Sequence, residues 1–355
     1  MKVAIIGAGL AGLACAHELN RNGIEPDIFE LKDYIGEALN FPAIAIRAFN
    51  MPVNNPLKVL RDKYDIHVKP HYVINEFIMV APSKTYRIKG NIGYVFRRGV
   101  HPGSFLDQVC SNLNVPVNFN ANVNLEELRY TYDSVVVATG NNTLTSKLGN
   151  QRVYFNGIVR IATVRGKFNT NSVTMWLNKL YSRNGYAYLV ADTETEARVV
   201  LIVTDVEYQE FEVYWNRFIG DYPFKDIVKM KDLRHTVGLV DPIKLDNTYF
   251  TGNAGGFIDS FLGFGTVKAL LSGAAAGHCI AKGLDYIDFM KETTRDIKDK
   301  YELRKAFNAM DNDDLDRLIS FVTKPGIKQL VYNNPFFRIT QIVPFVRMNN
   351  KLKHR

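Results

Sequence analysis

The pattern of hydrophobic positions in the first thirty residues predicts a strand, a helix and a second strand. Residues 2–6 form a short apolar run with β-branched side chains, which is typical of a buried strand. Residues 13–22 have helical spacing, and Gly23 marks the end of that helix. A second short strand then ends at Glu30. This order predicts a βαβ unit at the start of the chain.

The pattern changes farther along the chain. Up to residue 150 it predicts helices at 57–64 and 104–112, strands within 76–98, and further strands at 115–119 and 133–140. The strands within 76–98 are expected to be separated by turns at 82–83 and 89–91. From there to residue 245, alternating strands are interrupted by one amphipathic helix at 206–218; the strands span 152–162, 184–191, 197–204 and 233–240.

A parallel-type strand at 249–252 and a helix of small residues at 265–281 resume the first pattern, and 286–323 is helical and charged. The sequence therefore predicts an α/β protein whose Rossmann-like nucleotide-binding domain is split by an insertion. The expected parts are a nucleotide-binding domain at 1–75, 92–150 and 246–285, a sheet-rich, antiparallel substrate domain at 76–91 and 151–245, and a helical, basic C-terminal region at 286–355.

Composition narrows the class of protein only a little. The 355 residues are 46% hydrophobic and 23% charged, as in ordinary globular proteins, and no apolar stretch is long enough to span a membrane. The first strand begins at residue 2, which leaves no room for a signal peptide. Three widely spaced cysteines form no metal-binding pattern. We therefore expect a cytoplasmic protein without disulfides or a metal.

The net charge of +8 is confined to one end of the chain. Residues 1–316 contain equal numbers of acidic and basic side chains, and every charged residue after Asp316 is basic. The same segment carries the apolar stretches 335–339 and 342–346. Such a combination favours peripheral contact with an anionic membrane surface. The alternative is a helical tail that packs its apolar face on the protein. No nucleic-acid-binding module accompanies the charge.

The glycine pattern after the first strand predicts a dinucleotide site. Gly7 allows a tight turn, Gly9 lets phosphates approach the backbone, and Gly12 lets the helix pack close to the strand. Glu30 follows Gly12 by 18 residues, where a carboxylate can accept hydrogen bonds from both hydroxyls of a ribose. The predicted contacts in this unit are Gly7, Ala8, Gly9, Leu10, Ala11, Gly12, Glu30 and Leu31.

Two later segments complete the pattern. A buried strand ends in Ala138, Thr139 and Gly140, and residues 249–256 and 263–266 are glycine-rich loops before a small-residue helix. Together the three segments resemble the flavoproteins with two dinucleotide-binding domains, especially those of the para-hydroxybenzoate hydroxylase fold. This resemblance implies FAD as the cofactor. It adds as cofactor contacts Ala138, Thr139, Gly140, Gly252, Asn253, Gly263, Phe264, Gly265 and Thr266.

One position departs from that family. Asn253 stands where the family has an acidic residue that binds the ribitol chain. An asparagine can still form a hydrogen bond with a ribitol hydroxyl, but it carries no charge. We therefore expect FAD to bind with a somewhat altered affinity.

A narrower resemblance involves the middle of the chain. Residues 184–190, and residues 93–99 with 104–108 after them, are similar to segments of the geranylgeranyl reductase group. In that group an arginine lies against the FAD pyrophosphate or ribitol, a role that falls by position on Arg98, with Arg97 as the alternative. The resemblance implies an FAD-dependent reductase of C=C bonds in an isoprenoid lipid.

The substrate pocket is expected to involve Tyr186, Tyr188 and Phe257. Tyr188 stands where the reductase group has tryptophan, and Ala191 replaces its proline, which leaves the substrate open. The alternative is that Tyr186 and Tyr188 pack a core from one face of a strand. No residue is assigned as proton donor.

Two other functions compete with the reductase. A group A aromatic monooxygenase would use NAD(P)H and oxygen on the same fold, but it usually carries an Asp-Gly motif, to which Asn156-Gly157 is the nearest match. A flavoprotein that only carries electrons is the third possibility. A second glycine fingerprint is missing, so the electron donor is expected to be ferredoxin or a transiently docked NAD(P)H.

Overall fold

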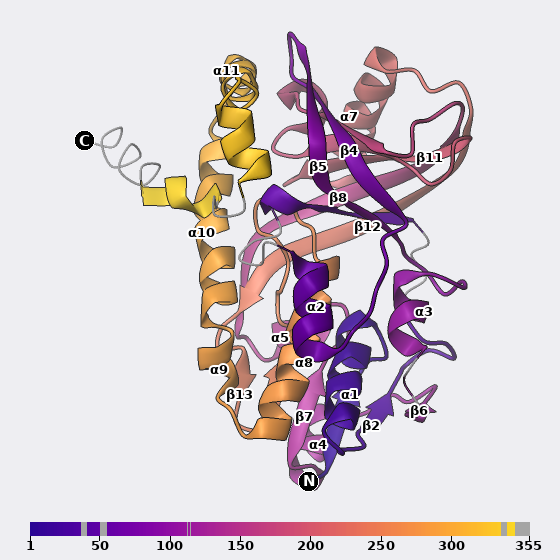
Figure 1. Cartoon of the computed structure of the whole chain (residues 1–355), viewed down its shortest axis with the longest axis vertical. Coiled ribbons are helices and arrows are strands. Elements are labelled where there is room, and N and C mark those ends of the chain that lie inside the picture. Colours follow the sequence, from indigo (N-terminus) through magenta and orange to yellow (C-terminus); the bar gives the residue numbers. More distant parts are fainter. Residues whose placement is uncertain (37–40, 50–54, 112, 114, 335–338, 345–355) are drawn as a thin grey trace.

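The computed structural model describes residues 1–36, 41–49, 55–111, 113, 115–334 and 339–344. Their strands form two sheets, with the larger sheet lying above the smaller one in Figure 1. A long C-terminal helix, α10 (Lys291–Asn308), runs alongside both parts. The βαβ start and the sheet-rich middle predicted from the sequence are both present.

The smaller sheet is the nucleotide-type sheet, with strand order β13-β14-β7-β1-β2-β6. All neighbours are parallel except the edge pair of β13 and β14. Its central strands β1 and β7 are buried at every position and apolar except for Ser134, as expected for a parallel sheet covered on both faces. The strands are β1 (Val3–Ile6), β2 (Asp27–Phe29), β6 (Val117–Asn118), β7 (Ser134–Val137), β13 (Lys244–Leu245) and β14 (Thr248–Phe250).

Two helices pack closely on this sheet, α1 (Leu10–Arg21) and α8 (Thr266–Lys282). The two helices also pack on each other. This contact depends on glycine, because a Cβ atom at Gly273 of α8 would lie 2.0 Å from the carbonyl oxygen of Ala11 in α1. A Cβ at Gly277 would lie 2.6 Å from the carbonyl oxygen of Cys15. The small residues of α8 therefore set the distance between the two helix axes.

The larger sheet has the order β12-β8-β11-β10-β9-β4-β5-β3 and is antiparallel except where β4 pairs with β9. Alternate residues of its strands face two different cores. Tyr186 and Tyr188 face the side toward the smaller sheet, whereas Ala187 packs beneath α7 (Tyr208–Asp221). The strands are β3 (Pro42–Ile46), β4 (Tyr72–Val80), β5 (Thr85–Arg97), β8 (Gln151–Arg165), β9 (Ser172–Trp176), β10 (Tyr186–Ala191), β11 (Glu196–Thr204) and β12 (Ile227–Val240).

Three expectations about this sheet need correction. The turn predicted at 89–91 is wrong, because β5 continues through it and only the register with β4 shifts there, between Ile74 and Glu76. The sequence pattern also missed β3 and β9. The structure places β3 and all of β5 in the larger sheet, although residues 42–46 and 92–97 were assigned to the nucleotide-binding part.

The remaining helices connect and cover the sheets. They are α2 (Pro56–Tyr64), α3 (Phe105–Cys110), α4 (Leu125–Thr131), α5 (Thr143–Lys147), α6 (Lys179–Ser182), α9 (Tyr286–Phe289) and α11 (Asn312–Val322). Over the described part of the chain, no helix combines the length and the apolar character that crossing a membrane requires.

The described part of the basic C-terminal segment packs on the protein. The side chains of Ile319, Tyr332 and Val343 are buried, and Arg317 pairs with Asp314 at 2.8 Å. The predicted apolar stretches are described only in part, because residues 335–338 and 345–355 lie outside the described residues. Up to residue 344, these contacts favour the packed-tail alternative.

The helix contact through Gly273 leads to a stability prediction. We expect Gly273→Ala to lower the free energy of unfolding by about 1–3 kcal/mol, because the added methyl meets a backbone oxygen that cannot turn away. Gly220→Ala in α7 is the matched control, since its Cβ would meet nothing within 4 Å. That change should be neutral or stabilising by up to about 1 kcal/mol. Urea unfolding measures both, and similar shifts in the two variants would contradict the prediction.

Candidate functional site

A cleft of about 820 Å³ lies between the carboxyl ends of the smaller sheet's strands and the inner face of the larger sheet. Open α/β sheets bind ligands at this edge. Most of the residues predicted as cofactor contacts line the cleft. They are Gly7, Gly9, Leu10, Ala11, Glu30, Leu31, Arg98, Ala138, Thr139, Gly140, Gly252, Asn253, Gly263, Phe264, Gly265 and Thr266.

The three glycines of the first loop have different surroundings. Gly7 has a φ of +108°, and a Cβ there would lie 2.5 Å from the carbonyl oxygen of Ala138. A Cβ at Gly12 would lie 2.0 Å from the carbonyl oxygen of Gly7, so Gly12 and Ala8 serve packing behind the cleft wall. Gly9 has an ordinary φ of −88° and open space where its side chain would be. The bare backbone at Gly9 therefore fits a ligand and is not required by the protein's own packing.

Glu30 is fixed at the end of β2 by backbone donors. Its Oε2 accepts a hydrogen bond from the amide of Ala8 at 2.8 Å, and its Oε1 accepts one from the amide of Lys32 at 3.0 Å. The carboxylate thus reaches across to the glycine loop and lines the cleft beside it. This is the position from which an acid can accept hydrogen bonds from ribose hydroxyls.

Two helices begin at the cleft. The N-caps of α1 and α8 are Gly9 and Gly265, and neither has a side-chain cap hydrogen bond. Their first amide groups therefore have donors to offer, and the helix dipoles add positive potential at the same place. Such termini bind phosphates and other anions. Asn253 also lines the cleft, and its Nδ2 donates to the carbonyl oxygen of Gly140, in the turn after β7, at 3.3 Å.

The structure separates the two candidate arginines. Arg98 lines the cleft, and its guanidinium lies 4.8 Å from the ring centroid of Phe41. Arg97, the preceding residue and the last one of β5, lines a different hollow and pairs with Asp192 at 3.7 Å. Of the two, only Arg98 is placed to contact a ligand in the cleft.

The part of the cleft that lies against the larger sheet is aromatic, and we call this part the chamber. Tyr186 and Tyr188 line it, with their ring centroids 6.4 and 6.2 Å from that of Phe264. The hydroxyl of Tyr186 donates to the carbonyl oxygen of Leu262, and burial raises the pKa of both tyrosines. Both therefore remain neutral phenols. Further apolar lining comes from Phe155, Val159, Ile202 and Leu233.

Phe257 does not belong to this chamber. Its side chain is fully buried in the core around the smaller sheet and lies outside the lining of the cleft. A Cβ at Gly255 would approach its ring at 2.8 Å. The predicted role of Phe257 in the substrate pocket is therefore not supported by its position.

Sequence reasoning missed two polar residues of the chamber, His235 and Arg304. Burial lowers the pKa of His235, and its Nε2 lies 3.0 Å from the carbonyl oxygen of Gly263, so a neutral imidazole donates to this loop. Arg304 stacks on Phe155 at 4.3 Å and donates to the carbonyl oxygen of Phe261 at 2.7 Å. Both contacts join segments far apart in sequence, and no motif could have indicated them.

A buried ionic cluster holds the loop that forms the chamber's edge. Lys300 of α10 lies 2.8 Å from Asp259 and 3.0 Å from Asp296, which in turn lies 3.2 Å from Lys268 of α8. The Oδ1 of Asp259 accepts hydrogen bonds from the amides of residues 261 and 262. Although burial opposes ionisation, the charges of Lys300 and Lys268 keep the pKa of Asp259 below its usual value. The cluster thus ties α10 and α8 to the glycine-rich loop.

Comparisons with known proteins agree with this geometry. The family profile of NAD(P)-binding Rossmann-like domains matches residues 5–64. A 40-residue segment, 11% of this chain, is 58% identical to the glutamate synthase [NADPH] small chain of Escherichia coli (strain K12). The chain covers only 8% of that relative's length.

The similar solved structures cover nearly the whole chain. A geranylgeranyl bacteriochlorophyll reductase-like protein from Thermoplasma acidophilum has a TM-score of 0.70 at 15% identity, over 97% of this chain and 98% of the other. The flavin-dependent brominase Bmp2 also has a TM-score of 0.70, at 13% identity, over 99% and 100%. Tetracycline destructase Tet(51) has a TM-score of 0.58 at 14% identity, over 93% and 96%. The predicted fold, a Rossmann-like domain with an inserted sheet-rich part and a helical C-terminal region, is therefore confirmed.

The different surroundings of Gly9 and Gly12 give a matched pair of variants. We expect Gly9→Ala to keep the wild-type unfolding midpoint and to weaken dinucleotide binding at least tenfold, because the methyl projects into the open cleft. Gly12→Ala should lower the midpoint, because its methyl meets the carbonyl oxygen of Gly7. Urea unfolding and titration with FAD and NAD+ measure both effects. If Gly9→Ala bound FAD and NAD+ as the wild type does, the cleft would not be the dinucleotide site.

Proposed function

We propose that this protein is an FAD-dependent oxidoreductase. The observation that carries the proposal is the convergence of two helix N-termini without side-chain caps, an open Gly9 and a fixed Glu30 on one cleft. This cleft continues into an aromatic chamber, so a long two-part cofactor has room to pass from one to the other. The fold shared with flavin-dependent enzymes supports the choice of FAD over NAD.

In this proposal each group of the cleft has a defined task. Glu30 accepts hydrogen bonds from the adenosine ribose, and the first amides of α1 bind the pyrophosphate beside Gly9. Arg98 adds a positive charge near the phosphates or the ribitol, and Asn253 hydrogen-bonds a ribitol hydroxyl. A flavin ring bound beside the N-terminus of α8 would have its reduced, more negative form stabilised by the helix dipole. When bound, the flavin would supply the hydride-transfer chemistry.

For the substrate we propose an isoprenoid lipid, whose C=C bond would take up a hydride from the reduced flavin at one carbon and a proton from a side chain or water at the other. The chamber supports this proposal, because Tyr186, Tyr188 and Phe264 with the aliphatic side chains around them would bury a hydrocarbon chain and exclude water. The neutral His235 and the buried Arg304 both bind carbonyl groups of the protein, so they hold the chamber wall. The likeness to the reductase-like structure supports the same substrate class.

An oxygen-dependent reaction is the second candidate. It is favoured by the equal TM-score of the brominase and by the likeness to the tetracycline destructase. The missing Asp-Gly motif near residue 156 argues against the aromatic monooxygenases. A flavoprotein that only carries electrons would need no substrate chamber, so the aromatic chamber argues against it.

Anaerobic reoxidation of the reduced protein tests the proposal. We expect the protein to bind FAD, to lose its oxidised flavin absorption on reduction with dithionite, and to regain it when a geranylgeranyl lipid is added. A fully saturated lipid of the same length is the control and should leave the flavin reduced. Return of the absorption only with oxygen would favour an oxygenase. If the protein binds no FAD, the cofactor proposal fails.

We also propose that the basic C-terminal end makes peripheral contact with an anionic membrane. Four cations follow the last described residue: Arg347, Lys351, Lys353 and Arg355. Because Ile319 is buried, a deletion from residue 317 would remove part of the core, so the test removes only the extreme end. We expect deletion of 345–355, and separately glutamine at these four positions, to reduce sedimentation with anionic liposomes. Binding to neutral liposomes should not change. Equal binding of the wild type and both variants to anionic liposomes would contradict the proposal.

A further inference from the structure

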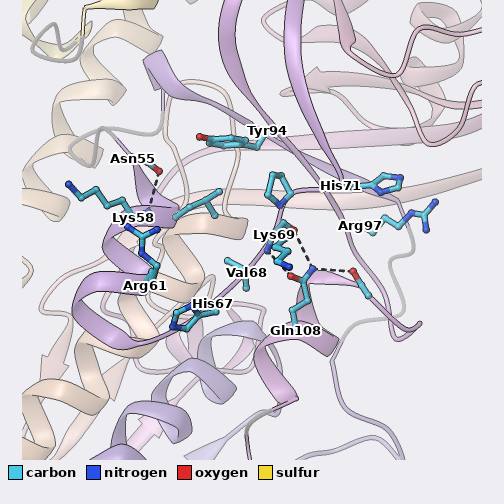
Figure 2. Close-up of a pocket in the computed structure, with 13 residues that line it drawn as sticks. Asn55, Lys58, Arg61, His67, Val68, Lys69, His71, Tyr94, Arg97 and Gln108 are labelled. Carbon is cyan, nitrogen blue, oxygen red and sulfur yellow. Dashed lines mark hydrogen bonds between the residues drawn. The ribbon is translucent and has the colours of Figure 1, made fainter.

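A second hollow of about 860 Å³ lies on the other side of the cleft wall. Its walls come from α2, the segment 67–71, β5 and the region of α3, and Figure 2 shows its lining. The hollow contains four permanent cations, Lys58, Arg61, Lys69 and Arg97, and we call it the basic pocket. Among the described residues, no aspartate or glutamate lines it. The remaining lining residues are Asn55, Leu57, His67, Val68, Pro70, His71, Tyr94, Gly103 and Gln108.

The positive charge of the basic pocket is only partly balanced. Arg61 lies 2.8 Å from Asp62, and Arg97 lies 3.7 Å from Asp192. Within the described part of the chain, no carboxylate pairs with the ammonium group of Lys58 or Lys69. These two lysines come from opposite walls, one on α2 and the other on the segment before β4. Together with Arg61 and Arg97 they leave the pocket with an excess of positive charge.

The backbone around these lysines is held by hydrogen bonds that the protein makes itself. Gln108 accepts from the amide of Lys69 at 2.7 Å and donates to the carbonyl oxygens of Lys69 and Gly103 at 3.2 and 3.1 Å. On the opposite wall, Asn55 caps α2 by accepting from the amide of Lys58 at 3.2 Å. The pocket is thus formed before any ligand arrives, which lowers the entropic cost of binding.

The basic pocket and the cleft share a wall. Arg97 lines the pocket and Arg98 lines the cleft, while α3 contributes Gln108 to the pocket and Phe105 to the cleft. Between them Phe105 stacks on Phe96 with ring centroids 4.4 Å apart. A ligand in the basic pocket would therefore lie next to the dinucleotide cleft without occupying it.

We propose that the basic pocket binds a nucleotide that carries a phosphate monoester, of the kind found in NADPH. Lysine and arginine are the usual phosphate ligands, and the apolar side chains of Leu57, Val68 and Pro70, with the ring of Tyr94, offer a surface for a ribose and base. The volume and concave shape suit a small molecule better than the flat surface of a partner protein. A role for this nucleotide as electron donor rests on the proposed function, whereas the binding does not.

Titration of the FAD-loaded, full-length protein with NADP+ tests the proposal, because FAD then fills the cleft. We expect NADP+ and ATP to bind more tightly than NAD+, which carries no phosphate monoester. Lys58→Glu and Lys69→Glu should each weaken NADP+ binding about tenfold or more. Lys225→Glu is the matched control, since this exposed lysine lies outside both hollows and the variant has the same net charge. It should bind NADP+ as the wild type does.

Three results would overturn the proposal. In the first, neither NADP+ nor ATP binds at millimolar concentration. In the second, NAD+ binds as tightly as NADP+. In the third, Lys58→Glu and Lys69→Glu both bind NADP+ with the affinity of the wild type. Inorganic phosphate that binds as tightly as NADP+ would show a simple anion site and would overturn the nucleotide assignment. The FAD content of every variant separates this outcome from failure of the proposed function. If the protein takes up no FAD, the same titration on Gly9→Ala, whose cleft is narrowed, still tests the pocket.

Discussion

The close approach of α1 and α8 is the constraint on which the rest of the structure depends. The helices meet at Gly273 and Gly277, where a single methyl group would overlap a carbonyl oxygen of α1. Because they pack this closely, their N-termini open at the same cleft, where the positive ends of the two dipoles add to one another. Larger residues in α8 would move the second terminus away. The anion-binding character of the cleft is therefore a consequence of helix packing as well as of the glycine loops.

Two buried side chains of α10 link the part of the cleft that we propose for the cofactor to the chamber. Lys300 and Arg304 lie two turns and more along α10, yet both are fully or almost fully buried and both reach the loop 259–263. A buried charge without a partner is strongly destabilising. Lys300 therefore needs Asp259 as its partner, and this ion pair holds the loop against α10. The same loop carries Leu262, and it is followed directly by Phe264; both residues contact Tyr186. The C-terminal helix thus shapes a chamber whose other walls come from the middle of the chain.

The sequence predicted the elements whose signal is local. The glycine loop, the buried strands and the small-residue helix are each specified by neighbouring residues, so the cleft contacts at Gly9, Glu30 and Gly265 could be named in advance. β3 was missed because periodicity alone cannot assign a short, wholly apolar run of five residues that begins with a proline. His235 and Arg304 were not predicted as site residues because their hydrogen-bond partners lie 28 and 43 residues or more away along the chain. The burial of Phe257 in the core depends on packing between distant segments, which the sequence does not show.

The shared wall between the two hollows separates two kinds of anion recognition. In the cleft, the proposed phosphate ligands are backbone amides and helix dipoles that act at close range, and the open space at Gly9 leaves room for that approach. In the basic pocket, long cationic side chains on opposite walls provide the charge, and they tolerate ligands of different shape. Backbone recognition suits a cofactor that stays bound, whereas flexible lysines suit a ligand that exchanges. The end of β5 divides these tasks between adjacent residues. Arg97, the last residue of the strand, lines the pocket, and Arg98, which follows it, lines the cleft.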